Sequence, residues 1–305
     1  MASLSRRCRG YGQNMAWRSI ADLLGDEGEV ALLGAPMEAG SVTPGRCDLA
    51  PAAVRRALKR FSTYDLETGI DLDCLRIDDR GDVPVQGLSP AAGFGAIREA
   101  VAAATASHAF TLLVGGNNAV TRPAAHGLAL PLDRVGLVTL DAHFDMRDTK
   151  DGPMNGNPVR CLLEDGLPGR NIIQIGLAPF ANTLKMHEDA LAAGARSFTI
   201  SEVVEDGVYA IVEDALRGLA HVEAILVDCD IDVIDRAQMP AAPGARPGGM
   251  PAAWFLEATR VLARDPKVRL IDLTELDPSL DVSDIGALTG ARWACEALAG
   301  YAERP

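Results

Sequence analysis

Two clusters of acidic side chains, each at two-residue spacing, directly follow apolar runs of the 305-residue chain. The first cluster follows residues 135–140 and the second follows residues 224–227. Their members are Asp141, His143 and Asp145 in the first, and Asp228, Asp230 and Asp232 in the second. In an extended segment this spacing turns alternate side chains to the same side. We therefore expect each cluster to gather its polar side chains at the end of a buried strand.

Such clusters favour a metal site. Carboxylates crowded at strand ends repel one another and lose hydration, so that without a cation some would have to take up protons. Aspartates with one imidazole suit Mn²⁺ better than a metal that prefers thiolates. A single Asp-x-His-x-Asp could be a solvated loop with a hydrogen-bonded histidine, but two clusters after two apolar runs favour metal binding. Cys229 alternates to the opposite face and is predicted to pack in the core.

The elements that would position these clusters alternate along the chain. Runs rich in Val, Ile and Leu, without polar alternation, are typical of strands covered on both faces. They occupy residues 29–34, 110–114, 135–140, 171–175, 224–227 and 268–273. Helix-like segments occupy residues 90–107, 182–193, 208–219, 251–263 and 285–301. Ser89 with Pro90, and Ser201 with Glu202, have the composition of helix starts. The alternation predicts an α/β fold with a largely parallel sheet, whose ligands bind at the carboxyl ends of the strands.

Composition excludes several classes of protein. With 29 basic and 42 acidic residues the net charge is −13, which repels nucleic acid and anionic membrane surfaces. No apolar run reaches the ~18 residues of a membrane helix, and the start of the chain lacks the apolar stretch of a secretory signal. Six scattered cysteines without a CxxC pair favour a reducing compartment. We expect a cytoplasmic protein with an N-terminal extension over residues 1–28 and a single domain over residues 29–305.

Ordered motifs resemble those of the ureohydrolase family, which comprises arginases, agmatinases, guanidinobutyrases and formimidoylglutamases. The resemblance runs from about residue 29 onward. It includes the family's Asp-Ala-His-x-Asp motif, its second aspartate motif and its late Glu-x-Asn-Pro signature. The matching segments are residues 34–55, 81–83, 115–118, 141–145, 230–235 and 274–278.

This resemblance implies a three-layer α/β/α fold and a binuclear Mn²⁺ centre that activates a water for hydrolysis of a linear C–N bond. The implied ligands are Asp141, His143, Asp145, Asp230 and Asp232, with Asp141 and Asp230 as bridging carboxylates. Asp145 would also accept a hydrogen bond from the attacking water, and Glu275 would pair with the planar amidine group of the substrate. These two are the expected catalytic residues. The family forms trimers or hexamers, which implies a homo-oligomer.

Two asparagines depart from the family pattern. Asn118 stands in place of a metal-binding histidine, and because an amide oxygen is the weaker ligand, one ion is expected to bind weakly or to be absent. Asn155 stands where a histidine shuttles protons in some members, and an amide does no acid–base work near neutral pH. Both changes are compatible with a catalytically silent relative that acts as a binding or regulatory subunit. The five retained ligands and Glu275 favour an enzyme.

Residues 141–147, 155–160 and 174–182 look most like the formimidoylglutamase branch, which converts N-formimidoyl-L-glutamate to glutamate and formamide in histidine degradation. Guanidinium groups bind carboxylates in a bidentate manner and would suit this dicarboxylate. The predicted substrate-binding residues are Arg147, Asn155, Asn157, Arg160 and Arg246. Arginines there would repel cationic agmatine. An agmatinase or guanidinobutyrase that releases urea is the alternative.

Overall fold

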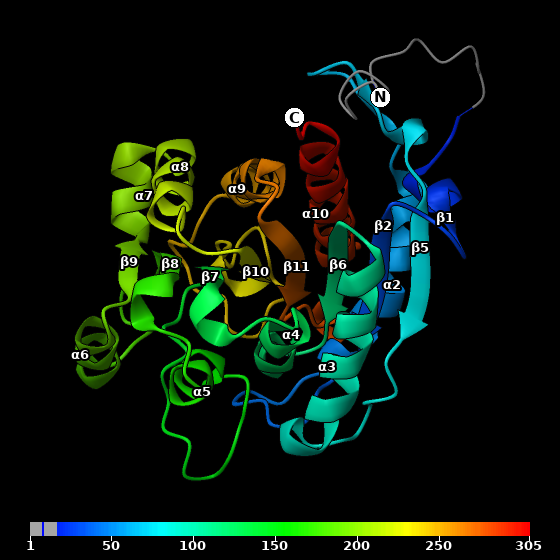
Figure 1. The fold of residues 1–305 in the computed structure, drawn as a ribbon. Coiled ribbons are helices and arrows are strands. Elements are labelled where there is room, and N and C mark those ends of the chain that lie inside the picture. Colours follow the sequence, from blue (N-terminus) through cyan, green and yellow to red (C-terminus); the bar gives the residue numbers. More distant parts are fainter. Residues whose placement is uncertain (1–7, 9–16) are drawn as a thin grey trace.

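The computed structural model describes Cys8 and residues 17–305 (Figure 1). Within this part of the chain, nine strands form one sheet in which every pairing is parallel. In spatial order they are β1 (Leu24–Gly25), β5 (Ile77–Asp82), β2 (Val30–Ala35), β6 (Phe110–Gly115), β11 (Val268–Thr274), β10 (Ala224–Asp230), β7 (Val135–Leu140), β8 (Ile172–Leu177) and β9 (Arg196–Thr199). A separate antiparallel pair joins β3 (Tyr64–Asp65) to β4 (Ile70–Asp71).

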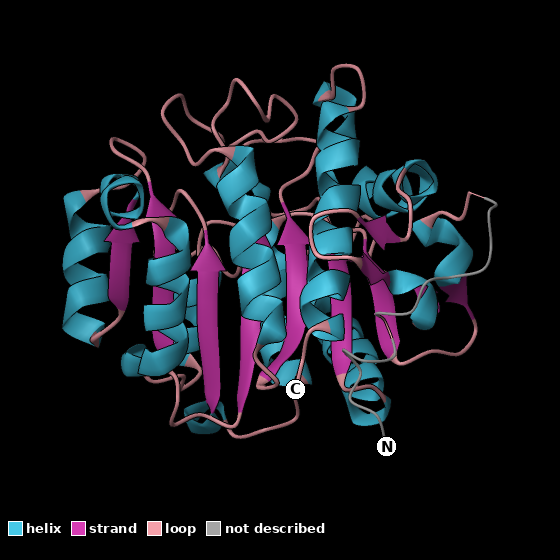
Figure 2. Ribbon diagram, turned by 90° about the horizontal axis from the view of Figure 1, so that it is seen from above, coloured by secondary structure: helices cyan, strands magenta, loops and turns pink. Residues whose placement is uncertain are grey.

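Helices cover both faces of this sheet, as Figure 2 shows. One face packs against α2 (Ala50–Ala57), α7 (Ile200–Asp206), α8 (Val208–Gly218), α9 (Ala252–Arg264) and α10 (Ile285–Ala302). The other packs against α3 (Pro90–Ser107), α4 (Thr121–Gly127), α5 (Pro158–Glu164) and α6 (Leu184–Ala193). The central strands are buried throughout because each face meets an apolar core. This burial explains their unbroken apolar runs and confirms the predicted α/β/α fold with its parallel sheet.

Short 3₁₀ turns link these elements. They are η1 (Ile20–Leu23), η2 (Cys47–Leu49), η3 (Leu58–Arg60), η4 (Leu72–Cys74), η5 (Asn118–Val120), η6 (Leu132–Arg134), η7 (Gly169–Asn171), η8 (Ile231–Val233) and η9 (Pro278–Leu280). Among the described residues, no helix is both long enough and apolar enough to cross a membrane.

All six predicted strands and five predicted helices are present, with ends that shift by a few residues. The start of α3 is confirmed, because the Ser89 hydroxyl accepts a hydrogen bond from the Ala92 N–H. The start of α7 lies earlier than predicted, at Thr199, which forms a capping box with Glu202. The sequence did not predict β5, whose half-exposed polar residues break the apolar pattern.

The N-terminal part of the chain contains a disulfide that the sequence did not predict. Cys8 and Cys74 are 66 residues apart in sequence, and their Cα atoms lie 5.3 Å apart. Disulfides are typical of oxidising compartments, so this pair does not fit the reducing compartment that the cysteine pattern favoured. Of the predicted extension, residues 1–7 and 9–16 lie outside the described residues. The division into an extension and one domain stays a prediction.

Candidate metal centre

Four neighbouring strands, β6, β11, β10 and β7, carry the site at their carboxyl ends. Their register brings the polar side chains together, because β10 pairs Cys229 with Leu140 of β7 and Asp230 with Thr274 of β11. The residues that follow these pairings therefore meet above the middle of the sheet. Cys229 itself is fully buried in the core, as predicted.

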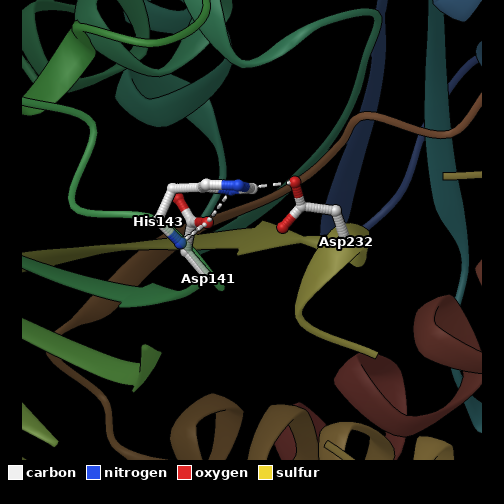
Figure 3. A group of neighbouring side chains, drawn as sticks. All are labelled: Asp141, His143 and Asp232. Carbon is white, nitrogen blue, oxygen red and sulfur yellow. Dashed lines mark hydrogen bonds and ion pairs between the residues drawn. The ribbon is translucent and has the colours of Figure 1, made fainter. Parts of the chain in front are cut away.

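At the centre, His143 lies between two aspartates (Figure 3). Its Nδ1 is 3.1 Å from Asp232 Oδ2 and 3.4 Å from Asp141 Oδ1. One ligand atom from each of these residues lies within 4.8 Å of the others. Asp141 Oδ2 is buried and has no hydrogen-bond partner among the described residues. Such an orphaned buried oxygen is costly, and a cation held by two carboxylates and an imidazole would satisfy it. The residues present thus fit a metal ion.

Burial and crowding keep protons on most of this cluster when no cation is considered. Asp232 is the exception: burial acts to raise its pKa, but the charge and the hydrogen bond of His143 lower it. Burial raises the pKa of Asp141 to about 6, and it raises the pKa values of Asp145 and Asp230 well above the usual range. Burial acts to lower the pKa of His143, but the charges of Asp232 and Asp141 outweigh it and raise this pKa to about 12. A divalent cation would take the place of these protons, since metal ligands bind in their deprotonated forms.

Asn118 presents its amide nitrogen to the cluster. The Nδ2 group donates to Asp145 Oδ2 at 2.5 Å. The Oδ1 atom accepts from the hydroxyls of Thr121 at 2.7 Å and Thr274 at 3.3 Å. Because an amide NH₂ group cannot ligate a cation, the residue predicted as a weak or lost ligand is a hydrogen-bond donor in this arrangement.

Asp145 and Glu275 both have left-handed backbone conformations, with φ of +53° and +61°. Such strain costs about 1–3 kcal/mol per residue and persists only where the surroundings impose it. Glu275 Oε1 accepts from the Asn118 N–H at 2.7 Å and from Asn155 Nδ2 at 3.0 Å. Burial raises the pKa of Glu275 to about 7, against the opposing effect of the Asn155 hydrogen bond. The two expected catalytic carboxyls are therefore held in fixed positions.

A cavity of about 120 Å³ opens onto the cluster. The predicted site residues that line it are His143, Asp145, Arg147, Asn155, Asp230, Asp232, Arg246 and Glu275. The structure thus brings ligand candidates from two strands to one surface together with Glu275 and two arginines. Asp228 does not line the cavity. It lies two residues before Asp230 in β10 and pairs with Asp272 of β11.

Arg147 and Arg246 both line the cavity, and no ion pair with a carboxylate is found for either of them among the described residues. Arg147 packs over Gly156, where an added Cβ would lie 2.7 Å from its Cδ atom, so a larger residue at this position would displace the Arg147 side chain. Arg246 uses Nη1 to bind the carbonyl oxygens of Gly244 and Ala245, at 2.6 and 3.3 Å. In a chain of net charge −13, arginines without acidic partners are available to bind an anionic ligand.

The structure corrects the placement of two predicted substrate-binding residues. Arg160, on α5, forms an ion pair with Asp189 of α6 and does not line the cavity. Asn157 is fully buried, and its Nδ2 donates to the carbonyl oxygens of Asp148 and Gly152, both at 3.1 Å. Asn157 therefore stabilises the conformation of the loop that precedes α5. Sequence spacing placed both residues near the pocket but could not show where their side chains point.

The sequence did not identify two residues that contact residues 141–145, the segment that carries three candidate ligands and is called the ligand segment. Gln174 and Asn182 both form hydrogen bonds with the backbone of residues 142–144. The available signal was Gln174, a polar residue in the middle of the apolar run of β8. A buried amide in such a run indicates a polar partner nearby.

Comparisons with known proteins agree with this geometry. A family model described as the arginase family matches residues 28–300. The formimidoylglutamase of Halalkalibacterium halodurans is 31% identical over 274 residues, which cover 88% of this chain and 86% of that protein. The crystal structure of Bacillus subtilis formimidoylglutamase matches with a TM-score of 0.90 at 27% identity, covering 97% of this chain and 95% of that one. A structure of Trypanosoma cruzi formiminoglutamase with Mn²⁺ shares the fold, with a TM-score of 0.84 at 24% identity and coverage of 91% and 94%.

Proposed function

The chain belongs to the arginase family, and we propose that it hydrolyses N-formimidoyl-L-glutamate to L-glutamate and formamide. It is a metal-dependent hydrolase of C–N bonds in linear amidines. Relatives that are 31%, 29% and 27% identical over most of the chain carry the name formimidoylglutamase. The charged residues of the cavity would bind both ends of such a substrate.

The charged residues that line the cavity carry this proposal. Four carboxylates, those of Asp145, Asp230, Asp232 and Glu275, line the same cavity as Arg147 and Arg246, for which no ion pair is found among the described residues. N-formimidoyl-L-glutamate has an amidine at one end and two carboxylates beyond it. Guanidinium groups would bind those carboxylates, and Glu275 would accept hydrogen bonds from the amidine. Agmatine would place an ammonium group against the arginines, which costs binding energy.

The carboxylates and imidazole suit Mn²⁺ as the resident metal. We propose that Asp141, His143, Asp145, Asp230 and Asp232 hold it, where it would activate the attacking water as a Lewis acid. Two ions are expected, one of them weakly bound, because Asn118 supplies an N–H donor in place of a ligand. The Trypanosoma cruzi structure, which contains Mn²⁺, supports this choice of metal.

The hydrogen bonds of Asn155 support the proposed catalytic carboxyl and the wall of the cavity. Asn155 orients Glu275 through the 3.0 Å hydrogen bond to Oε1, and it does not transfer protons. Asn155 Oδ1 also accepts the Val42 N–H at 2.9 Å, which fixes one wall of the cavity. From the sequence and the family we also propose a trimer or hexamer and a cytoplasmic location, although the Cys8–Cys74 disulfide is more typical of an oxidising compartment.

A substrate panel tests the proposed function. The protein is purified with added Mn²⁺ and assayed with N-formimidoyl-L-glutamate, agmatine and 4-guanidinobutyrate, scoring formamide and urea. We expect formamide from the first compound and no urea from the other two. Rapid urea release would instead support a guanidino hydrolase. No product from any substrate, with Mn²⁺ bound, would support a silent family member.

A further inference from the structure

We propose that Asn182 is a positioning residue for the metal ligands, because its side-chain amide clamps the backbone on both sides of His143. The inference rests on the proposed metal-dependent function. Asn182 lies in the loop that follows β8, and it contacts the segment that follows β7.

The clamp consists of two hydrogen bonds of opposite sense. Asn182 Oδ1 accepts the Phe144 N–H at 2.8 Å, and Asn182 Nδ2 donates to the Ala142 carbonyl oxygen at 3.0 Å. These two backbone groups flank His143, so one planar amide restrains the dihedral angles that aim the imidazole. The Ala178 N–H also donates to the Ala142 carbonyl oxygen, at 3.0 Å. The loop after β8 therefore supports the ligand segment along its length.

Gln174 completes the clamp on the next peptide group. It is fully buried, and its Nε2 donates to the Phe144 carbonyl oxygen at 3.0 Å. That carbonyl belongs to the peptide bond that leads into Asp145, whose φ is +53°. A strained conformation needs such external restraint. Asn182 and Gln174 together bind the N–H and the carbonyl of Phe144, the residue between two ligands.

Asn182 lines the cavity, yet both polar atoms of its side chain are already bound to backbone. As a positioning residue, Asn182 acts through these two backbone hydrogen bonds and not through the substrate. Its effect should therefore appear in metal affinity and kcat, with little change in KM. Groups that orient metal ligands typically contribute about 10- to 100-fold to metal affinity.

The variant Asn182→Asp separates positioning from electrostatics. An aspartate can still accept the Phe144 N–H, but its second oxygen would face the Ala142 carbonyl oxygen, so one bond becomes a repulsion. Electrostatics alone predicts tighter Mn²⁺ binding, because a negative charge is added near the site. Positioning predicts weaker binding despite that charge.

Asn171 supplies a matched control at the opposite end of β7. It is fully buried, and its Nδ2 also donates to backbone carbonyl oxygens, of Asp133 at 3.1 Å and Val135 at 2.8 Å. Asn171→Asp should lower the melting temperature and leave Mn²⁺ affinity unchanged. Any effect of Asn182→Asp on metal affinity that Asn171→Asp lacks is then specific to the ligand segment.

The experiment is a calorimetric Mn²⁺ titration of the full-length wild type, Asn182→Asp and Asn171→Asp, with kcat and KM measured alongside. We expect Mn²⁺ affinity to fall by about 10- to 100-fold in Asn182→Asp only. Equal or tighter binding by Asn182→Asp, or an equal loss in Asn171→Asp, would overturn the positioning role while leaving the proposed function intact. Failure of the wild type to bind Mn²⁺ would overturn the proposed function and this inference together.

Discussion

Asn118 Nδ2 donates a hydrogen bond to Asp145 Oδ2 at 2.5 Å, so the residue proposed to replace a histidine ligand presents an amide donor to another proposed ligand. The threonine hydroxyls that bind Asn118 Oδ1 fix this orientation from behind. Relative to a histidine at this position, Asn118 would therefore supply a hydrogen-bond donor to Asp145 in place of a metal contact.

The variant Asn118→His should restore the missing ligand. We expect its Mn²⁺ titration to show a weaker site that tightens by about tenfold or more, since imidazole is the better ligand. Thr121→Val provides a control, because it removes a hydrogen bond to Asn118 without adding a ligand. An Mn²⁺ titration of Asn118→His identical to that of the wild type would argue that position 118 does not face the weaker ion.

Replacing Asp230 by Ala should abolish metal uptake and activity together, because the carboxylate proposed to bridge the two ions would serve both. Metal content after dialysis, measured with the melting temperature, checks this. Asp214→Ala is the control for loss of one acidic charge, since Asp214 pairs with Arg196 and Arg217 away from the cavity. Stoichiometric Mn²⁺ in folded Asp230→Ala protein would refute the ligand assignment.

Chelated protein should lose stability as the pH rises from about 4 to 8. The raised pKa values of Asp141, about 6, and Glu275, about 7, mean that the folded state holds more protons than the unfolded state above pH 4. The free energy of unfolding therefore falls with rising pH across this window. His143, with its pKa raised to about 12, stabilises the fold fully below its ordinary pKa of 6.5 and contributes less above it. All three groups act in the same direction.

Mn²⁺ should remove this trend, because it replaces the protons. The measurement compares melting temperatures at pH 5, 6.5 and 8, with EDTA and with saturating Mn²⁺. Carboxyls such as Asp214 and Glu202, whose pKa values are lowered by hydrogen bonds, titrate below this window and do not oppose the trend. Higher stability at pH 8 than at pH 5 in EDTA would contradict the proposed protonation of the cluster.

Much of the site was predictable from the sequence because the ligands sit next to strongly apolar strands. Asp141 follows β7 directly and Asp230 ends β10, so identifying the strands located these candidate ligands. The directions of Arg160 and Asn157 were not predictable, because they depend on a helix start and a loop fold that spacing does not encode. The partners of Asn182 were equally hidden, since they lie about 40 residues away in sequence.

Arg147→Ala tests recognition of the substrate carboxylate. Loss of a hydrogen bond to a charged group costs about 1.5–3 kcal/mol, which is roughly a ten- to hundredfold fall in kcat/KM. Arg147→Lys should recover part of this loss, because lysine lacks the planar fork. Bound Mn²⁺ should stay constant in both variants.

Arg160→Ala is the matched control for Arg147→Ala, because Arg160 pairs with Asp189 outside the cavity. It should leave kcat/KM on N-formimidoyl-L-glutamate near the wild-type value. An unchanged kcat/KM in Arg147→Ala, or an equal fall in Arg160→Ala, would remove Arg147 from substrate recognition.

The most direct measurement follows the labelled amidine carbon of N-[¹³C]formimidoyl-L-glutamate by NMR, with metal-free protein and after stepwise addition of Mn²⁺. We expect no turnover without metal, and conversion of the label to formamide with release of glutamate as Mn²⁺ is added. Appearance of the label in N-formylglutamate with release of ammonia, or an unreacted substrate in the presence of Mn²⁺-loaded protein, would contradict it.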